Sequence, residues 1–169
     1  MTRADRTPTL PEVRYRPPRL ADAAQVHALV AACKPLDLNS VYAYMLLCTH
    51  FADTCAIAEQ DGRAVGFVSG YLEPPTSGVL FIWQVAVSAG VRGRGVAKRL
   101  LEDILGRPAC HRVQHLETTI TPSNEASWAL FRALARDRGT DVHDGVLFRR
   151  EDFGTDDHEE ERLVRIGPF

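Results

Sequence analysis

Residues Leu80 to Leu101 read LFIWQVAVSAGVRGRGVAKRLL. The run from Leu80 to Val87 is apolar except for Gln84 and is rich in β-branched and aromatic side chains, so we expect a strand buried on both faces. Glycine then recurs between Ser88 and Gly95, which ends the strand. Beyond this turn, apolar residues fall at helical spacing, at Val96, Ala97, Leu100, Leu101, Ile104 and Leu105. The stretch therefore predicts a strand, a glycine-rich turn and a helix.

The glycine-rich turn has the features of an anion-binding site. The first amide N–H groups of a helix have no partner within the helix and point out of its N-terminus. Gly93 and Gly95 have no Cβ that would keep an anion away from the main chain, and Arg92 and Arg94 add positive charge. We therefore predict that the turn binds a pyrophosphate.

The residues around the last glycine indicate which cofactor carries that pyrophosphate. A P-loop needs Lys and then Ser or Thr after Gly95, where Val96 and Ala97 stand, and a dinucleotide-binding turn needs Gly or Ala at Lys98. Both patterns fail. Arg92-x-x-Gly95-x-Ala97, placed directly after a Val-Ala-Val strand, resembles the acetyl-CoA signature of the GCN5-related N-acetyltransferase (GNAT) superfamily. The alternative is a helix start with incidental glycines.

Composition narrows the class of protein. The chain has 169 residues, 45% hydrophobic and 25% charged, which suits one domain with a substantial core. Residues 1–11 read as a mobile tail and residues 12–169 as a single domain. The net charge of -2 gives no basic field for nucleic acid or an anionic membrane. No apolar run approaches the roughly 20 residues of a bilayer span, and the four cysteines lack C-x-x-C spacing, so we expect a cytoplasmic protein.

The remaining chain divides into alternating strands and helices. An acidic loop is expected at 151–161. The order of elements is similar to the GNAT fold, an α/β fold in which four helices flank a mixed central sheet of about seven strands with splayed central strands. Strands are predicted at 13–16, 54–59, 64–71, 80–87, 113–120, 142–149 and 162–166, and helices at 22–34, from a cap at Asn39 or Ser40 through Cys48, at 96–105, and at 124–139.

The GNAT resemblance implies a binding mode for acetyl-CoA as co-substrate. The pantetheine arm would lie between the strands at 80–87 and 113–120 and bond the main chain of Val85 and Val87, with Asn124 facing it. Many members of the superfamily have a Tyr seven residues after this Asn, where it can protonate the leaving thiolate. Here that position is Phe131, so we assign no general acid. The pyrophosphate would be held by Arg92, Gly93, Arg94, Gly95, Val96 and Ala97.

A narrower resemblance comes from four separated segments. LDLNSVYAYMLLCTHFADTC, FIWQVAV, LETTITPSN and HEEERLVRI resemble the L-2,4-diaminobutyrate acetyltransferases of ectoine biosynthesis. This resemblance implies acetyl transfer from acetyl-CoA to the 4-amino group of L-2,4-diaminobutyrate by a homodimer. The alternatives are an acetyltransferase for another small amine, such as a polyamine or an aminoglycoside, and a non-catalytic acetyl-CoA sensor.

Residues for the amine substrate follow from its charge. Asp37, before the second helix, is a candidate for binding an ammonium group, and its alternative role is to cap the helix. Tyr42 offers a hydroxyl, and Tyr44 is the weaker candidate of the two because aromatic residues on an apolar helix more often pack in the core. Trp83 would wall the amine by a cation–π contact or else be a core residue, and Thr119 is a further pocket candidate.

The reaction also needs a base. An alkyl ammonium has a pKa of about 10.4, and it must lose a proton before it can attack a thioester. We expect Glu159 to accept this proton, with Glu160 and Glu161 as rivals and a solvated acidic loop as the alternative. The histidines and cysteines show no metal-ligand spacing, so no metal is expected.

Overall fold

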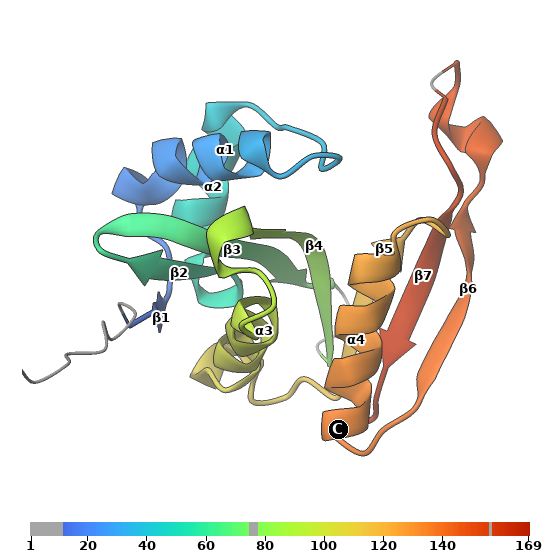
Figure 1. The fold of residues 1–169 in the computed structure, drawn as a ribbon. Coiled ribbons are helices and arrows are strands. Elements are labelled where there is room, and N and C mark those ends of the chain that lie inside the picture. Colours follow the sequence, from blue (N-terminus) through green and yellow to red (C-terminus); the bar gives the residue numbers. More distant parts are fainter. Residues whose placement is uncertain (1–11, 75–77, 156) are drawn as a thin grey trace, which may run out of the picture.

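The computed structural model describes residues 12–74, 78–155 and 157–169; the predicted tail at 1–11 lies outside them. The described residues form a mixed sheet in the order β1-β2-β3-β4-β5-β7-β6, with helices on both faces (Figure 1). The strands are β1 Arg14–Arg16, β2 Ala56–Gln60, β3 Arg63–Leu72, β4 Val79–Val87, β5 His115–Ile120, β6 Val142–Phe148 and β7 Glu161–Ile166, and the α-helices are α1 Ala23–Ala32, α2 Val41–His50, α3 Val96–Leu105 and α4 Glu125–Asp137.

The predicted order of strands and helices is confirmed. Of the two proposed caps for α2, the structure uses Ser40, whose side chain accepts a hydrogen bond from the Ala43 N–H at 3.2 Å. The predicted loop at 151–161 is wrong in part, because a 3-10 turn spans Arg150–Phe153. The Asp152 carboxylate accepts a 2.7 Å hydrogen bond from the Arg149 N–H and so closes this turn locally.

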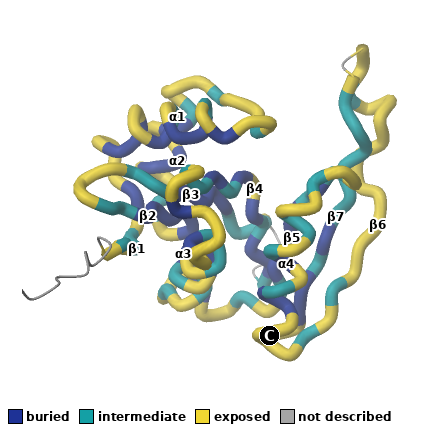
Figure 2. The backbone as a smooth tube through the Cα atoms, viewed as in Figure 1, coloured by how far each residue is buried: buried dark blue, intermediate teal, exposed yellow. Residues whose placement is uncertain are grey.

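Two apolar cores lie on opposite faces of the sheet. One contains buried residues of α1 and α2, such as Val26 and Tyr44, together with Phe67 of β3. The other lies under α3 and α4 and includes Leu100 and Phe131. Figure 2 shows the buried backbone concentrated where the helices cover the strands, whereas β6 is exposed along its length. The sheet is therefore well covered at its centre and bare at its β6 edge.

An ion-pair cluster ties the first strand to the body. The Arg16 guanidinium binds the Asp22 carboxylate at 2.7 and 2.9 Å and the Glu59 carboxylate at 2.6 Å. Asp22 is buried, and the Arg16 hydrogen bond holds the pKa of its carboxyl below the ordinary value. The cluster joins β1, the start of α1 and β2 at the end of the sheet remote from α4.

A bulge in β4 coincides with the point where β4 parts from β5. Gly70 of β3 pairs with Ile82, but the preceding residue Ser69 pairs with Gln84, so Trp83 is an extra residue in β4. The parallel pairing between β4 and β5 also ends at Ile82. A Cβ on Gly70 would lie 2.7 Å from the Phe81 carbonyl oxygen, so only glycine fits this crossing. Beyond the bulge, β4 has a free edge facing β5.

The parting of the strands corrects one sequence-based expectation. β4 was expected to be buried on both faces, but only its first half approaches this description. Trp83 is 49% exposed, and Val85 and Val87 are only partly buried, because β5 no longer covers them. Gln84 and Ala86 point to the other face and remain buried under α1 and α2.

Candidate active site

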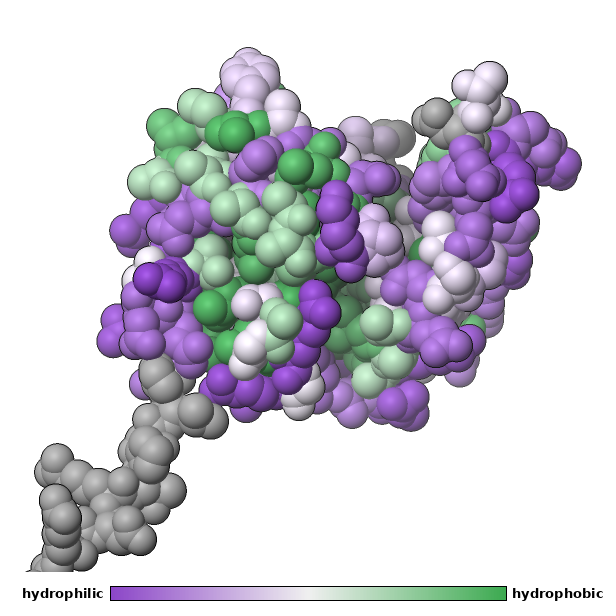
Figure 3. Space-filling view, turned by 45° about the horizontal axis from the view of Figure 1, so that its top comes forward, coloured by the Kyte–Doolittle hydropathy of each residue, from purple (hydrophilic) through white to green (hydrophobic). Residues whose placement is uncertain are grey.

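A groove of about 290 Å³ opens beside the free edge of β4. It is bounded by β4, the turn before α3, the first half of α4 and the segment that follows α1. Figure 3 shows the surface hollowed between the body of the molecule and the part formed by β6 and β7, which we call the β6–β7 arm. Five of the residues predicted to bind the cofactor line this groove, namely Val85, Val87, Arg92, Ala97 and Asn124. Sequence reasoning missed its other lining residues, which are Cys33, Lys34, Pro35, Leu36, Ala126, Ser127 and Leu130.

The main chain of β4 directs N–H and C=O groups toward this groove. The Ser88 N–H donates to the Val65 carbonyl at 2.8 Å and therefore points toward β3. Because N–H and C=O groups alternate between the two edges of a strand, those of Val85 and Val87 point toward the free edge. The Val87 carbonyl there accepts a 3.0 Å hydrogen bond from Arg92 Nε, which anchors the turn before α3 to the end of β4.

The turn before α3 is open toward solvent. Gly93 and Gly95 have φ values of +74° and +75°, a left-handed conformation that glycine adopts without strain. A Cβ on either would meet no described atom within 4 Å. Gly95 is the N-cap of α3, and no side-chain hydrogen bond caps the helix. The first amide groups of α3 thus remain available to an anion; the side chain of Val96 is buried, so this residue can contribute only its main chain.

Asn124 and Phe131 define the α4 side of the groove. The Asn124 side-chain oxygen accepts a 3.1 Å hydrogen bond from the Ser127 N–H and caps α4, so its amide NH₂ is the group left for a ligand. Phe131 is buried in the core under α4. The position at which many superfamily members have a tyrosine therefore offers neither a hydroxyl nor access to the groove.

The predicted substrate residues lie on the sheet face that carries α1 and α2. Trp83 is the extra residue at the bulge. The next residue, Gln84, donates a side-chain hydrogen bond to the main-chain carbonyl of Asp37. Tyr42 is 67% exposed at the start of α2, whereas Tyr44 is fully buried, as its packing-based interpretation required. Leu116, Thr118 and Ile120 of β5 are buried, and Leu116 and Ile120 belong to the core under α3 and α4. Because side chains alternate along a strand, Thr119 points to the opposite face, which is the face of Asp37.

Glu161 completes this group. Thr119 pairs with Leu163, and Glu161, two residues before Leu163 in β7, points to the same face. Burial raises the pKa of the Glu161 carboxyl, and the nearby carboxylates of Asp37 and Glu159 raise it further, while Thr119 and His158 oppose the rise. Its Oε2 atom is buried without a hydrogen-bond partner among the described residues. A carboxylate with these properties is poised to accept a proton.

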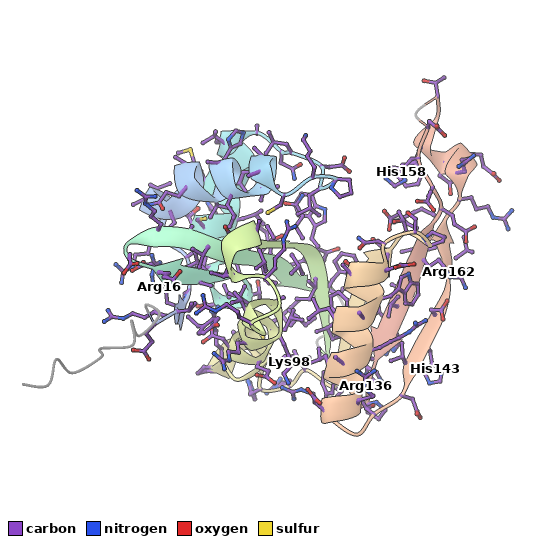
Figure 4. All side chains as sticks on the ribbon, viewed as in Figure 1. Arg16, Lys98, Arg136, His143, His158 and Arg162 are labelled. Atoms are coloured by element: carbon purple, nitrogen blue, oxygen red, sulfur yellow. The ribbon has the colours of Figure 1, made fainter. Side chains whose placement is uncertain are left out.

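His158 stands next to this carboxylate. Its Nε2 atom lies 3.8 Å from Glu161 Oε1, and its ring stacks on Phe153 with centroids 4.1 Å apart. Figure 4 shows His158 on the β6–β7 arm, near the side that faces the segment between α1 and α2. Its Nδ1 lies 2.6 Å from the Glu159 carbonyl oxygen. Since a carbonyl can only accept, Nδ1 carries a proton, and Nε2 is the ring nitrogen that faces Glu161.

The two neighbouring acids have other partners. Glu159, the base expected from the sequence, accepts a hydrogen bond from the Ser123 hydroxyl near the start of α4. Glu160 pairs with Arg162 at 3.1 Å. That pair lines a larger open depression of about 710 Å³ between α4 and the β6–β7 arm, which contains none of the residues predicted for substrate or cofactor. The structure thus gives the three successive glutamates different partners.

Within residues 12–74, 78–155 and 157–169, no group of His, Cys, Asp and Glu residues has the arrangement of a metal site. None of the helices that the structure describes combines the length and hydrophobicity needed to cross a bilayer.

The site combines three features: central strands that separate, a free strand edge that can pair with an extended amide, and an uncapped helix start beside that edge. Together they define an N-acetyltransferase site of the acyl-CoA-dependent class. Over residues 23–135, the chain matches the Acetyltransferase (GNAT) family. The chain belongs to this family.

Its similarity to particular members extends over nearly the whole chain. It is 52% identical to the L-2,4-diaminobutyric acid acetyltransferase of Bordetella parapertussis, over 93% of this chain and 86% of the relative. It is 50% identical to the protein of the same name from Halomonas elongata, over 91% of this chain and 80% of the relative. The structure of diaminobutyrate acetyltransferase EctA from Paenibacillus lautus, in complex with L-2,4-diaminobutyric acid and coenzyme A, matches with a TM-score of 0.90 and 43% identity, over 94% of this chain and 96% of that one.

Proposed function

We propose that this protein transfers the acetyl group of acetyl-CoA to the 4-amino group of L-2,4-diaminobutyrate. The observation that carries the proposal is the free edge of β4, where its pairing with β5 ends, beside the uncapped start of α3, with the Asp37 and Glu161 carboxylates near enough to interact electrostatically. The relatives described above, at 50 to 52% identity, support the identity of the diamine. The product would be N4-acetyl-L-2,4-diaminobutyrate, and the resemblance to ectoine enzymes places the step in ectoine biosynthesis.

The groove and its glycine turn suit acetyl-CoA as co-substrate. The pyrophosphate would bind the main chain from Arg92 to Ala97, including Gly93, Arg94, Gly95 and Val96, with the two arginines adding charge. The pantetheine amides would pair with Val85 and Val87 as an added strand would, with Asn124 opposite. In this placement the pantetheine would extend along β4 away from the turn, so the thioester would lie near the bulge at Trp83.

The amine side suits a small diamine. At neutral pH, diaminobutyrate carries two ammonium groups and one carboxylate. Asp37 and Glu161 would balance the ammonium charges, the Trp83 ring would contact the amine, and Tyr42 and Thr119 would donate or accept hydrogen bonds. A longer amine would need its second charge at a different distance from the thioester, so the spacing of the two acids would select the substrate.

Glu161 is the base that we propose for deprotonating the 4-ammonium group. A raised carboxyl pKa makes it a better proton acceptor than an ordinary glutamate, and His158, whose Nε2 lies 3.8 Å from the Glu161 carboxylate, would pass the proton on toward solvent. Glu159 remains the alternative base, although it is bonded to Ser123. No residue is assigned as general acid, since a thiol of pKa about 8.5 is a fair leaving group by itself.

Matched variants distinguish the two candidate bases. Glu161→Gln should lower kcat at neutral pH by about 100-fold, within the usual range for a general base, and remove the acidic limb of the pH profile of kcat/KM. Glu159→Gln, two residues away, should change kcat by less than about threefold. The reverse ranking would reassign the base to Glu159.

The activity itself is tested by comparing amines. CoA-thiol release is measured with diaminobutyrate, ornithine, lysine and spermidine side by side, and the product is identified by NMR. We expect the highest kcat/KM with diaminobutyrate and acetylation at N4. Equal or faster turnover of another amine would overturn the substrate, and acetylation at N2 would overturn the regiochemistry. Binding of acetyl-CoA without turnover of any amine would instead support a sensor.

We also propose a cytoplasmic homodimer. β6 is the outer strand of the sheet, and Val146, Leu147 and Phe148 at its end are each nearly half exposed (Figure 2). An unpaired apolar edge strand promotes association, and pairing with a second copy would cover it. The use of acetyl-CoA and the four buried, unpaired cysteines support a cytoplasmic location.

A further inference from the structure

A buried Gln–Tyr pair bonds the segment that carries Asp37 to β4. Gln84, 5% exposed, donates from Nε2 to the Asp37 carbonyl at 2.7 Å and accepts at Oε1 from the Tyr44 hydroxyl at 3.2 Å. The Tyr44 hydroxyl in turn accepts from the Asn39 N–H at 3.4 Å. Two side chains thus contact both a carbonyl and an amide of the same three-residue segment.

The direction of each of these three hydrogen bonds is fixed. A main-chain carbonyl can only accept, so the Gln84 amide must present its NH₂ to Asp37 and its oxygen to Tyr44. The Tyr44 hydroxyl therefore donates to Gln84 and is left to accept from Asn39. A glutamate at position 84 would have no donor for the Asp37 carbonyl, and a phenylalanine at 44 would leave two partners unpaired. The arrangement requires these two residue types.

Packing contacts and a hydrogen bond hold Gln84 and Tyr44 in place. Tyr44 is fully buried, and its ring makes edge contacts with His27 and Phe67, with centroids 6.0 and 6.2 Å apart. The Gln84 main-chain N–H donates to the buried Ser69 hydroxyl at 3.2 Å, next to the bulge at Trp83. The Gln84–Tyr44 pair therefore holds residues 37–39 at a fixed position relative to β4.

Residues 37–39 have few other connections. Within the described part of the chain, the hydrogen bonds that reach them are those from Gln84 and Tyr44. Asp37 and Leu38 are exposed. Without the pair, the segment would be held only at its two ends, by α1 and by the Ser40 cap of α2. A charged side chain on such a segment would no longer be held in one position.

We infer that Gln84 and Tyr44 are positioning residues that hold Asp37 at a fixed place beside Trp83 and thereby set the affinity of the site for its diamine. This inference rests on the proposed function for the identity of the substrate. The two residues act through Asp37 and need not touch the amine. Their loss should affect the diamine far more than acetyl-CoA, whose groove contains neither residue.

The test uses Gln84→Met, Tyr44→Phe and a matched control. Arg107→Met is the control, because Arg107 Nη1 binds the Ala52 and Cys55 carbonyls at 3.0 and 2.6 Å and so fastens a different segment by the same kind of bond. Hydrogen exchange of peptides covering 36–40 is measured by mass spectrometry without substrates. The KM values for diaminobutyrate and acetyl-CoA and the melting temperature are then measured for all proteins.

In the Gln84 and Tyr44 variants, we expect exchange at 36–40 and the KM for diaminobutyrate each to rise about tenfold, with the KM for acetyl-CoA within about twofold of wild type. The control should lower the melting temperature without either change. Unchanged exchange, or a diaminobutyrate KM that rises no more than in the control, would overturn the inference. If the wild-type protein does not acetylate diaminobutyrate, the proposed function fails, whereas the exchange comparison still tests the bonds to residues 37–39.

Discussion

Replacing Gly95 by alanine tests the anion-binding turn at the start of α3. Gly95 has a φ of +75°, and a Cβ there would meet no described atom of the protein within 4 Å. The added methyl group therefore clashes with nothing in the free enzyme. It would occupy the space through which a pyrophosphate must approach the first amide groups of α3.

The expected magnitude has two separable parts. Placing a Cβ in the left-handed region costs about 1–2 kcal/mol of folding free energy. A hydrogen bond from an amide to a charged oxygen contributes about 1.5–3 kcal/mol. Displacing the pyrophosphate enough to break one such bond should raise the KM for acetyl-CoA by roughly 10- to 100-fold. The KM for the amine should stay close to that of wild type.

Gly139→Ala is the matched control for strain. Gly139 has a φ of +63°, and a Cβ there would also meet nothing within 4 Å, but it follows the end of α4, away from the groove. Both variants should lose similar unfolding free energy in urea titrations. Only Gly95→Ala should raise the acetyl-CoA KM in steady-state assays. An acetyl-CoA KM equal in the two variants would refute the location of the pyrophosphate.

Two further predictions concern stability and assembly. Arg16→Met should lower the unfolding free energy by about 1–3 kcal/mol at about pH 7. Because the folded-state pKa of Asp22 lies below its unfolded value, the stabilisation is present above about pH 4 and is lost as the pH falls through the folded pKa. The difference from wild type in urea titrations should therefore shrink near pH 3, and a constant difference would exclude the Asp22 contribution. Phe148→Asp should convert the proposed dimer to a monomer in analytical ultracentrifugation, and an unchanged mass would exclude the β6 edge as the interface.

The central strand, the glycine turn and the following helix were predictable because their information is local. A strand–turn–helix unit needs only consecutive residues, so Arg92 to Ala97 can be placed at a helix start by their spacing alone. The starts of α2 and α4 were predictable for the same reason, although only the structure shows that Ser40 rather than Asn39 caps α2 and that Asn124 caps α4, each bonding a main-chain N–H three residues ahead. The whole order of elements followed in the same way.

The extent of burial in β4 was not predictable in this way. The apolar run from Leu80 to Val87 looks uniform in the sequence, yet Trp83 is half exposed and the residues after it line a groove. The cause is the bulge at Trp83 together with the end of pairing with β5. Both depend on the register with β3 and β5, which are distant in the chain.

The sequence alone was sufficient to predict the strand, the glycine turn and the helix start on which the proposed acetyl-CoA site is built, because these are properties of contiguous main chain. It gave no means of choosing among Glu159, Glu160 and Glu161, three neighbouring residues of the same type. The fold gives them different partners: Glu159 meets Ser123, Glu160 meets Arg162, and Glu161 is partly buried beside Thr119 and His158. Side chains alternate between the faces of a strand, so the face that Glu161 occupies in β7 follows from the pairing of β5 with β7, and only the tertiary structure establishes that register.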